Sequence, residues 1–188
     1  MKCDLLVTSP PYGDNATTVP YGQHSYLPLQ WIDLEDIDSS LDSRCLKTTH
    51  EIDRRSLGGS RRDAITRAET AVERSPSLAR FLKSIRHEPS DRRTRTAAFV
   101  ADLDKSLDPI LKTLRKHAYM IWVVGNRRIA GRQLPTDAIL HELLVARNSI
   151  PVIEICRNIP TKRMALKNSV TSTMVKEKIL VFRHTGVS

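Results

Sequence analysis

The sequence predicts an α/β fold in which four short strands form one sheet and helices connect them. Four apolar runs of strand length lie at residues 3–9, 118–125, 152–156 and 178–182. Between them, apolar residues recur with the spacing of one helix face, most clearly in 75–85, 94–116 and 134–147. Strands that alternate with helices are typical of an α/β sheet.

The first strand ends at a stiff corner. Leu5, Leu6 and Val7 form its apolar run, and Ser9 then stands directly before two prolines and Tyr12. Each proline fixes φ near about −65° and has no N–H to donate, so the strand must stop there. The corner presents one hydroxyl, fixed carbonyls and a ring. Since open α/β sheets bind ligands at the carboxyl ends of strands, we expect a site here.

The segments after this corner are polar and then helical. Residues 13–25 form a loop of suitable length and polarity to close over a substrate. Residues 26–34 begin a helix with Pro28 in its first turn. Residues 61–74 predict a charged, mostly exposed helix. Ser75 and Pro76 predict the N-cap and first position of the next helix.

The second half of the chain carries the remaining strands. A helix is expected from about 94 to 116, with Lys112, Arg115 and Lys116 in its last turn, and Pro109 should kink or divide it. The continuous apolar run 118–125 predicts a strand buried on both faces. A basic loop at 157–174 separates the last two strands.

Composition indicates an ordinary globular domain. The chain has 188 residues, of which 40% are hydrophobic and 27% charged. No apolar run approaches a membrane span, and the apolar part of the N-terminus is too short for a secretory signal, so a cytoplasmic protein is expected. Cys3, Cys45 and Cys156 are scattered, without disulfide or zinc spacing, and no metal is expected.

Positive charge is concentrated in one segment. The net charge is +9, and residues 44–95 contain 14 Lys/Arg against 7 Asp/Glu. Basic proteins of this size often bind polyanions, although a solvated helix face would give the same count. On charge alone, the solvated helix face is the better interpretation.

The corner resembles a known sequence motif. Ser9-Pro10-Pro11-Tyr12 resembles motif IV of the DNA amino-methyltransferases, and residues 8–23 are similar to bacterial restriction-modification methyltransferases in particular. The alternative is a purely structural role, in which the prolines end the strand and the tyrosine packs against the fold. The resemblance covers about 2–34 and 94–184, and it identifies the four strands as the second half of a Rossmann-like class I methyltransferase sheet, in the order 4-5-7-6 with the last strand antiparallel.

The resemblance also implies a domain organisation. Residues 1–188 would be a single partial catalytic domain, and 35–95 a helical, basic insert that can recognise the target sequence. It implies double-stranded DNA as partner, and it makes contact with DNA phosphates the favoured interpretation of the basic segment 44–95. The residues expected to contact DNA are Asn15, Tyr21, Arg61, Arg62, Arg92, Arg93, Asn126, Arg127, Arg128, Lys162 and Arg163.

The chemistry implied by the resemblance is methylation of an exocyclic amino group. The Ser9 hydroxyl and the Pro10 carbonyl would accept its N–H bonds, Pro11 would hold the turn, and the Tyr12 ring would stack on a flipped base. Stacking needs the ring and not the hydroxyl. Cytosine C5 methylation is rejected, because no cysteine follows a proline.

Several function classes remain open. Serine at the first motif position favours N4 of cytosine, with N6 of adenine as the alternative. A non-catalytic DNA-binding subunit or remnant, and a methyltransferase acting on RNA or protein, are the hypotheses from other classes.

The motif for the expected cofactor, S-adenosylmethionine, is missing. In the family it is held by a Gly-rich turn, but the glycines at 13, 22, 58, 59, 125, 131 and 186 make no strand–Gly-x-Gly–helix pattern. The main cofactor site is therefore expected on a complementary polypeptide. In this chain, only Thr8 and Ser9 are expected to lie beside the cofactor. Three explanations are ranked in the following order: a natural two-subunit enzyme, a reading frame that is broken or assigned too late a start, and an inactive remnant.

Overall fold

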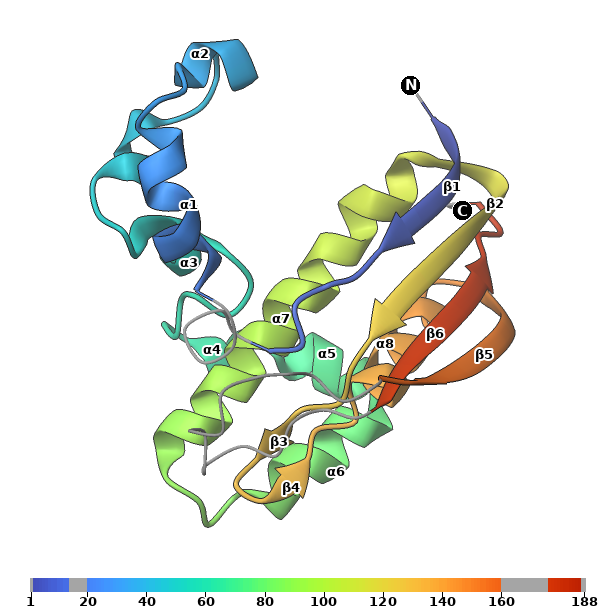
Figure 1. The fold of residues 1–188 in the computed structure, drawn as a ribbon. Helices are drawn as coiled ribbons and strands as arrows, with labels where there is room; N and C mark the ends of the chain where they lie inside the picture. The colour runs from blue at the N-terminus through green and yellow to red at the C-terminus, as the bar shows by residue number, and fades with distance from the viewer. Residues whose placement is uncertain (1, 14–19, 160–175, 187–188) are drawn as a thin grey trace.

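A computed structural model describes residues 2–13, 20–159 and 176–186, and it has a mixed α/β fold, as predicted (Figure 1). Its main sheet has the strand order β1-β2-β6-β5. Strand β1 runs parallel to β2, whereas β6 is antiparallel to both of its neighbours. These strands are β1 (Cys3–Thr8), β2 (Leu114–Val124), β5 (Ile150–Asn158) and β6 (Lys176–Arg183).

Helices occupy most of the chain between β1 and β2. None of the helices in the described ranges is long and apolar enough to cross a membrane. A hairpin of two short strands, β3 (Arg128–Ile129) and β4 (Arg132–Gln133), follows β2. The helices are α1 (Tyr21–Leu29), α2 (Leu34–Ile37), the 3₁₀ helix η2 (Ser43–Leu46), α3 (Glu51–Arg55), α4 (Ala64–Arg67), α5 (Glu69–Arg74), α6 (Pro76–Ser84), α7 (Ser90–Lys112) and α8 (Thr136–Val145).

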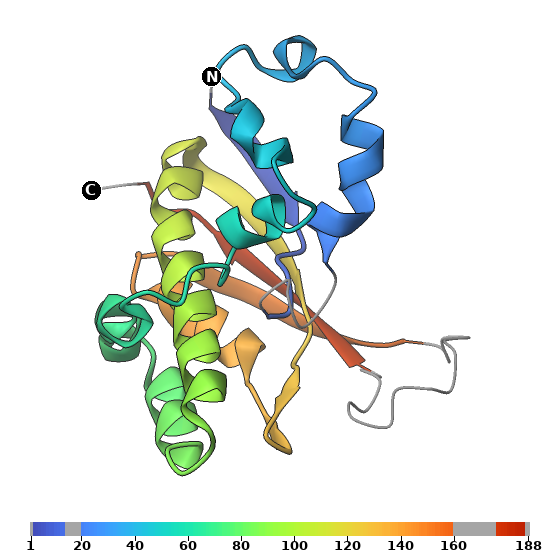
Figure 2. The ribbon, with the colours of Figure 1, turned by 90° about the vertical axis from the view of Figure 1, so that its left-hand side faces the viewer.

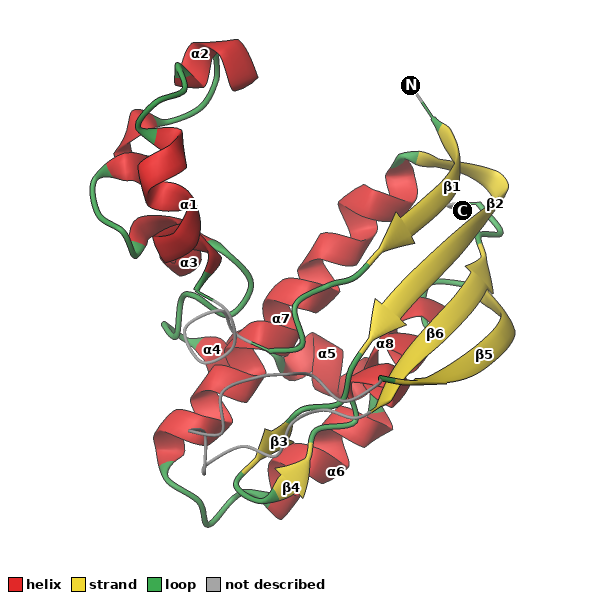
Figure 3. Ribbon diagram, viewed as in Figure 1, coloured by secondary structure: helices red, strands yellow, loops and turns green. Residues whose placement is uncertain are grey.

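The core lies between the sheet and the helices on one of its faces. In Figure 3, α7 and α8 both lie behind the sheet. Met120, Trp122 and Val124 of β2 point to that side and are fully buried, as are Leu180 and Phe182 of β6. The prediction that Ser75 caps α6 is confirmed, because its hydroxyl accepts a hydrogen bond from Leu78 N–H.

The opposite face of the sheet is open in the described structure. The prediction that 118–125 is buried on both faces is wrong, because buried residues of β2 alternate with more exposed ones and Tyr119 is 46% exposed. Leu5 (55%), Val7 (62%) and Ile153 (55%) are exposed on the same face. The apolar character of the run therefore reflects a second face that no described helix covers.

The predictions for Pro28 and Pro109 need correction. Helix α7 is continuous from Ser90 to Lys112, and Pro109 does not divide it. Pro109 is exposed near the helix end, where it removes one backbone hydrogen bond while the buried face keeps the helix packed. The helix ends at Lys112, so Arg115 and Lys116 belong to β2. Helix α1 begins at Tyr21, which places Pro28 in its last turn.

The 61–74 segment is not the mostly exposed helix that was predicted. It forms the two short helices α4 and α5, and Ala64, Ala68 and Ala71 are fully buried. Ala64 and Ala68 pack with small residues of α7, where side chains of this size allow the helices to approach closely. Charged residues on the other sides of these helices gave the segment its exposed appearance.

Helices α1, α2 and α3 form a lobe that stands away from the sheet (Figures 1 and 2). Asp53 of α3 accepts a hydrogen bond of 2.8 Å from Gly22 N–H of α1 and so ties the lobe together. Trp31 is 89% exposed on it. The segment 35–95 is thus divided between two places. Its first part belongs to the lobe, whereas Leu78 and Phe81 of α6 belong to the hydrophobic core. That this segment recognises a DNA target stays a prediction.

Candidate functional site at the carboxyl ends of the strands

The corner after β1 has the rigid geometry that its prolines predict. Strand β1 ends at Thr8, which is half-buried, and Ser9 is exposed directly after it. Pro10 is buried and Tyr12 is partly buried. Gly13 has a φ of 155°, which side chains with a Cβ rarely adopt. The chain thus turns sharply and leaves the Ser9 hydroxyl at the surface.

The sheet topology brings other segments to this corner. Strands β1, β2 and β5 run in the same direction, so their carboxyl ends lie at one edge, and β6 begins at that edge because it is antiparallel. Glu177 at the start of β6 is paired with Arg157 at the end of β5. Residues far apart in the sequence therefore meet beside Ser9 and Tyr12.

A chain of polar contacts runs from the corner to β6 and β5. The Tyr12 hydroxyl donates a hydrogen bond of 3.0 Å to Glu177 Oε1, and Ser9 Oγ lies 3.4 Å from the same hydroxyl. Glu177 is only 9% exposed. Its second carboxylate oxygen accepts a hydrogen bond from the Arg157 guanidinium in a close ion pair. The motif is thus anchored to the far side of the sheet.

The surroundings of Tyr12 hold its phenol in the neutral form. Burial raises the pKa of Tyr12, and the hydrogen bond to Glu177 and the negative charge of that carboxylate raise it further. The hydrogen bond with Ser9 and the charge of Arg157 act in the opposite direction but are outweighed. Tyr12 therefore acts as a hydrogen-bond donor at neutral pH, with its ring fixed in direction.

A second polar cluster lies on the other face of the sheet. Lys178 Nζ is 2.8 Å from Asp137 Oδ2 and 2.5 Å from Glu154 Oε1, and these hydrogen bonds raise the pKa of Lys178. Burial acts to raise the pKa of Asp137, but hydrogen bonds with Lys178, Ala138 N–H and Asn126 lower it overall. Asn126 Oδ1 accepts a 3.1 Å hydrogen bond from Asp137 N–H and thereby fixes the start of α8.

Most of the predicted DNA-contacting arginines near α7 are engaged within the chain. Arg61 pairs with Asp91, Arg62 lies 3.5 Å from Asp63, and Arg92 donates to Glu88 at 2.9 Å. Arg93 is exposed and has no ion pair among the residues that the structure describes. Exposed ion pairs of this kind are weak, so the arginines can exchange partners for phosphates at little cost.

The remaining candidates lie in three places. Arg128 is exposed on β3, and Arg127 precedes it and accepts a hydrogen bond from Leu134 N–H through its carbonyl. Tyr21 is exposed at the start of α1. Asn15, Lys162 and Arg163 fall outside the described residues. The contact of all these residues with DNA stays a prediction.

Glu177 and Arg157 were not assigned a role from the sequence. They are separated from Tyr12 by more than a hundred positions, and nothing local marks them as partners of the motif. The available signal was position: Glu177 is an acidic residue directly before the apolar run of the last strand. An acidic residue at the predicted start of this strand could therefore have been proposed as a partner of the motif.

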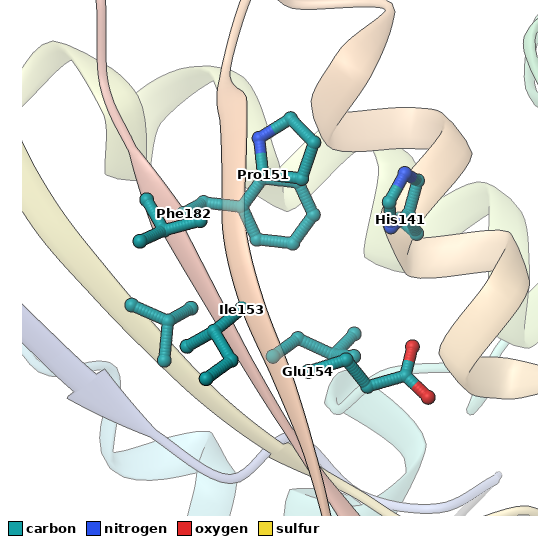
Figure 4. A pocket seen from close by; sticks show the side chains of 8 residues that line it. His141, Pro151, Ile153, Glu154 and Phe182 are labelled. Atoms are coloured by element: carbon teal, nitrogen blue, oxygen red, sulfur yellow. The ribbon is translucent and has the colours of Figure 1, made fainter.

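A small hollow lies away from the corner. It is lined by His141 of α8 together with Pro151, Ile153, Glu154 and Phe182 of β5 and β6 (Figure 4). The His141 and Phe182 rings meet edge to face with their centres 5.2 Å apart. The hollow lies toward the start of β5, whereas Arg157 is near its end. It thus has no part in the Ser9 site.

The described residues do not fit S-adenosylmethionine as its main binding site. Strand β1 leads into prolines, and Gly125 after β2 leads into the β3–β4 hairpin instead of a helix. The described ranges thus contain no Gly-rich turn from a strand into a helix. Nor do they contain a group of His, Cys, Asp or Glu residues that could hold a metal ion.

The chain is similar to part of a known methyltransferase. No family model matches it. It is 35% identical over 189 residues to the type II methyltransferase M.MvaI of Kocuria varians. The match takes in 96% of this chain but only 40% of the length of that protein. Nearly all of the chain, including both sides of the Ser9 site, is thus similar to a portion of a type II methyltransferase.

Proposed function

We propose that this chain forms the base-binding part of a DNA amino-methyltransferase. The enzyme would transfer a methyl group from S-adenosylmethionine to the exocyclic amino group of a flipped base. The observation that carries the proposal is the Ser9-Pro10-Pro11-Tyr12 corner, with its hydroxyl exposed at the carboxyl edge of the sheet. The similarity to a type II methyltransferase supports it.

The corner supplies what an amino group needs in order to react. The lone pair of an exocyclic amine is conjugated with the ring, so the amine is a poor nucleophile. Acceptors that hold both N–H bonds favour a more tetrahedral nitrogen, and we assign this role to Ser9 Oγ and the Pro10 carbonyl. Because prolines fix the backbone, these acceptors are preorganised. Tyr12 would stack on the flipped base.

We favour N4 of cytosine as the methylated atom. The preference rests on serine at the first motif position, and N6 of adenine is the alternative. Ser9 and Pro10 can accept N–H bonds from either amino group, so the difference must come from contacts to the rest of the base. Analysis of the methylated nucleosides would decide between the two.

We further propose that a complementary polypeptide carries the cofactor site. Val7, Ile121, Val181 and Ile153 are neighbours in one row across the open face of the sheet. Strand β1 has no partner on its other edge among the described strands. Open apolar faces and free strand edges favour association with another chain segment. Strands 1 to 3 of the methyltransferase sheet would pair with β1 and bring the cofactor beside Thr8 and Ser9.

Methylation by the reassembled enzyme tests this function. The chain should be mixed with a polypeptide carrying the Gly-rich half, tritiated S-adenosylmethionine and duplex DNA. We expect label in the DNA with both polypeptides, and a loss of about a hundredfold for Ser9→Ala, because one preorganised acceptor is removed. Lys105→Gln, at an exposed position of α7 outside the segment 35–95, is the control. Full activity of Ser9→Ala would contradict the role of the corner.

A non-catalytic DNA-binding subunit is the second candidate. It is favoured by the lack of a cofactor-binding turn in the described ranges and by the surface arginines Arg93 and Arg128. Such a subunit would bind DNA with a strong dependence on salt but would transfer no methyl group with any partner. Replacing Arg93 and Arg128 by Ala should reduce the slope of log binding constant against log salt concentration by about two under both proposals. Only methyl transfer separates them.

A further inference from the structure

The two hydrogen bonds of the Tyr12 hydroxyl have a fixed direction. A phenol carries a single proton, and that of Tyr12 is donated to Glu177 Oε1 at 3.0 Å. In the 3.4 Å contact with Ser9 Oγ, the phenol oxygen can therefore act only as acceptor. Ser9 must then be the donor. Its proton points toward Tyr12, and its lone pairs remain available on the exposed side.

We propose that Glu177 is a positioning residue that orients the Ser9 hydroxyl through Tyr12. By accepting the phenol proton, Glu177 makes Tyr12 accept the proton of Ser9. The lone pairs of Ser9 Oγ are then free for an N–H of the target amino group. This inference rests on the proposed function, and it adds a direction and a cause to the acceptor role of Ser9.

The position of Glu177 suits this task. It is 9% exposed, so water competes little for its carboxylate. One carboxylate oxygen receives the Tyr12 proton and the other is paired with Arg157. An ionised carboxylate has acceptors and no donor, so it can interact with Tyr12 in one direction only. Arg157, itself 61% exposed in its side chain, holds the carboxylate in place from the next strand.

The substitution Glu177→Gln should reverse the direction of both Tyr12 hydrogen bonds. Its amide has the size of the carboxylate but carries a donor as well as an acceptor. With Arg157 on one side, the amide oxygen is expected to turn to the guanidinium, which leaves the NH₂ group facing Tyr12. The phenol would then accept from Gln and donate its proton to Ser9. One lone pair of Ser9 Oγ would then be occupied by Tyr12 and would no longer be available to the target amine.

Titration of Tyr12 in the isolated chain tests the hydrogen-bond chain without any methylation. The phenol can be followed by NMR with ¹³Cζ-labelled tyrosine, and Tyr12→Phe assigns its signal among the four tyrosines. We expect Glu177→Gln to move the Tyr12 midpoint to lower pH, because the negative charge and the acceptor are both lost. Glu154→Gln, which removes the same charge from the other face of the sheet, should leave the midpoint in place.

Kinetics of the reassembled enzyme test the effect on Ser9. We expect Glu177→Gln to lower kcat about tenfold with little change in KM for DNA, since one oriented hydrogen bond is affected. In the Ser9→Ala background the same change should have no further effect, because Glu177 acts through Ser9. Multiplying losses in the double variant would overturn the proposal.

The two readouts separate this inference from the proposed function. A Tyr12 midpoint that Glu177→Gln does not move would overturn the hydrogen-bond chain, whatever the activity. Failure of the reassembled wild type to methylate DNA would instead count against the proposed function, and with it the role of Ser9 toward an amine. A moved midpoint with kcat unchanged would contradict the positioning role.

Discussion

At the scale of single residues, the hydroxyl of Tyr12 is the feature that changes the interpretation of the motif. Stacking alone needs only the ring, and the sequence predicts that Tyr12→Phe keeps much of the activity. The hydroxyl, however, donates to Glu177 and lies beside Ser9. The ring is thus fixed at its far end, and we propose that the residue both stacks on the base and orients Ser9.

Two replacements of Tyr12 separate these parts. We expect Tyr12→Phe to lower methyl transfer by the reassembled enzyme about tenfold, the effect of one hydrogen bond. Tyr12→Ala should lower it by a further factor of about ten or more, because base–ring stacking is lost as well. Steady-state rates on one duplex measure both. Equal losses for the two variants would contradict the stacking role.

Asp137 should make the stability of the fold depend on acid. It is 6% exposed, and hydrogen bonds from Lys178 and Ala138 lower its pKa below the ordinary 3.8 in spite of burial. A carboxyl with a lowered folded pKa stabilises the fold above its unfolded pKa, and this contribution is lost as pH falls through the folded pKa. Urea unfolding at a series of pH values should thus show stability declining below about pH 4.

The Asp137→Asn variant isolates this contribution. We expect it to lose about 2 kcal/mol at neutral pH and to show a weaker decline in acid, because its side chain does not titrate. Asp36→Asn on the exposed helix α2 removes the same charge and should behave like the wild type. Parallel pH curves for wild type and Asp137→Asn would show that the Lys178 pair does not contribute.

At the scale of elements, the sequence predicts the strands well and the helix limits less well. Strands β1, β2, β5 and β6 each overlap the apolar run from which it was predicted, although β1 ends at Thr8 and β2 begins at Leu114, within the predicted helix. Pro28 was predicted in the first turn instead of the last, and Pro109 was expected to divide a helix that is continuous. Packing of the buried faces, which the local sequence does not show, decides where a helix begins and ends. The link from Tyr12 to Glu177 spans 165 positions, so only the topology could reveal it.

The open face of the sheet should make the isolated chain self-associate. Val7 is 62% exposed on β1, whose outer edge has no partner among the described strands. We expect Val7→Asp to reduce association in sedimentation velocity while changing the unfolding free energy by less than about 1 kcal/mol. Met120→Asp, at a fully buried position of β2, should instead unfold the chain. Unchanged association of Val7→Asp would show that self-association does not occur through this face.

At the scale of the whole molecule, the described structure gathers the candidate site at one edge of the sheet. Strands β1, β2, β6 and β5 place the Ser9 corner and the Glu177–Arg157 pair at one edge, beside an open apolar face. The chain spans 40% of the relative that it matches. We infer that the base and the cofactor are bound by different parts, which meet where Thr8 and Ser9 leave the sheet.

Calorimetric titration of the purified chain with S-adenosylmethionine tests this division most directly. The proposal predicts no heat of binding at micromolar cofactor for the 188 residues alone, and its recovery when a polypeptide carrying the Gly-rich half is added. Circular dichroism of the same sample would show that the chain is folded. Micromolar binding by the folded chain alone would contradict the division and would place a cofactor site within these residues.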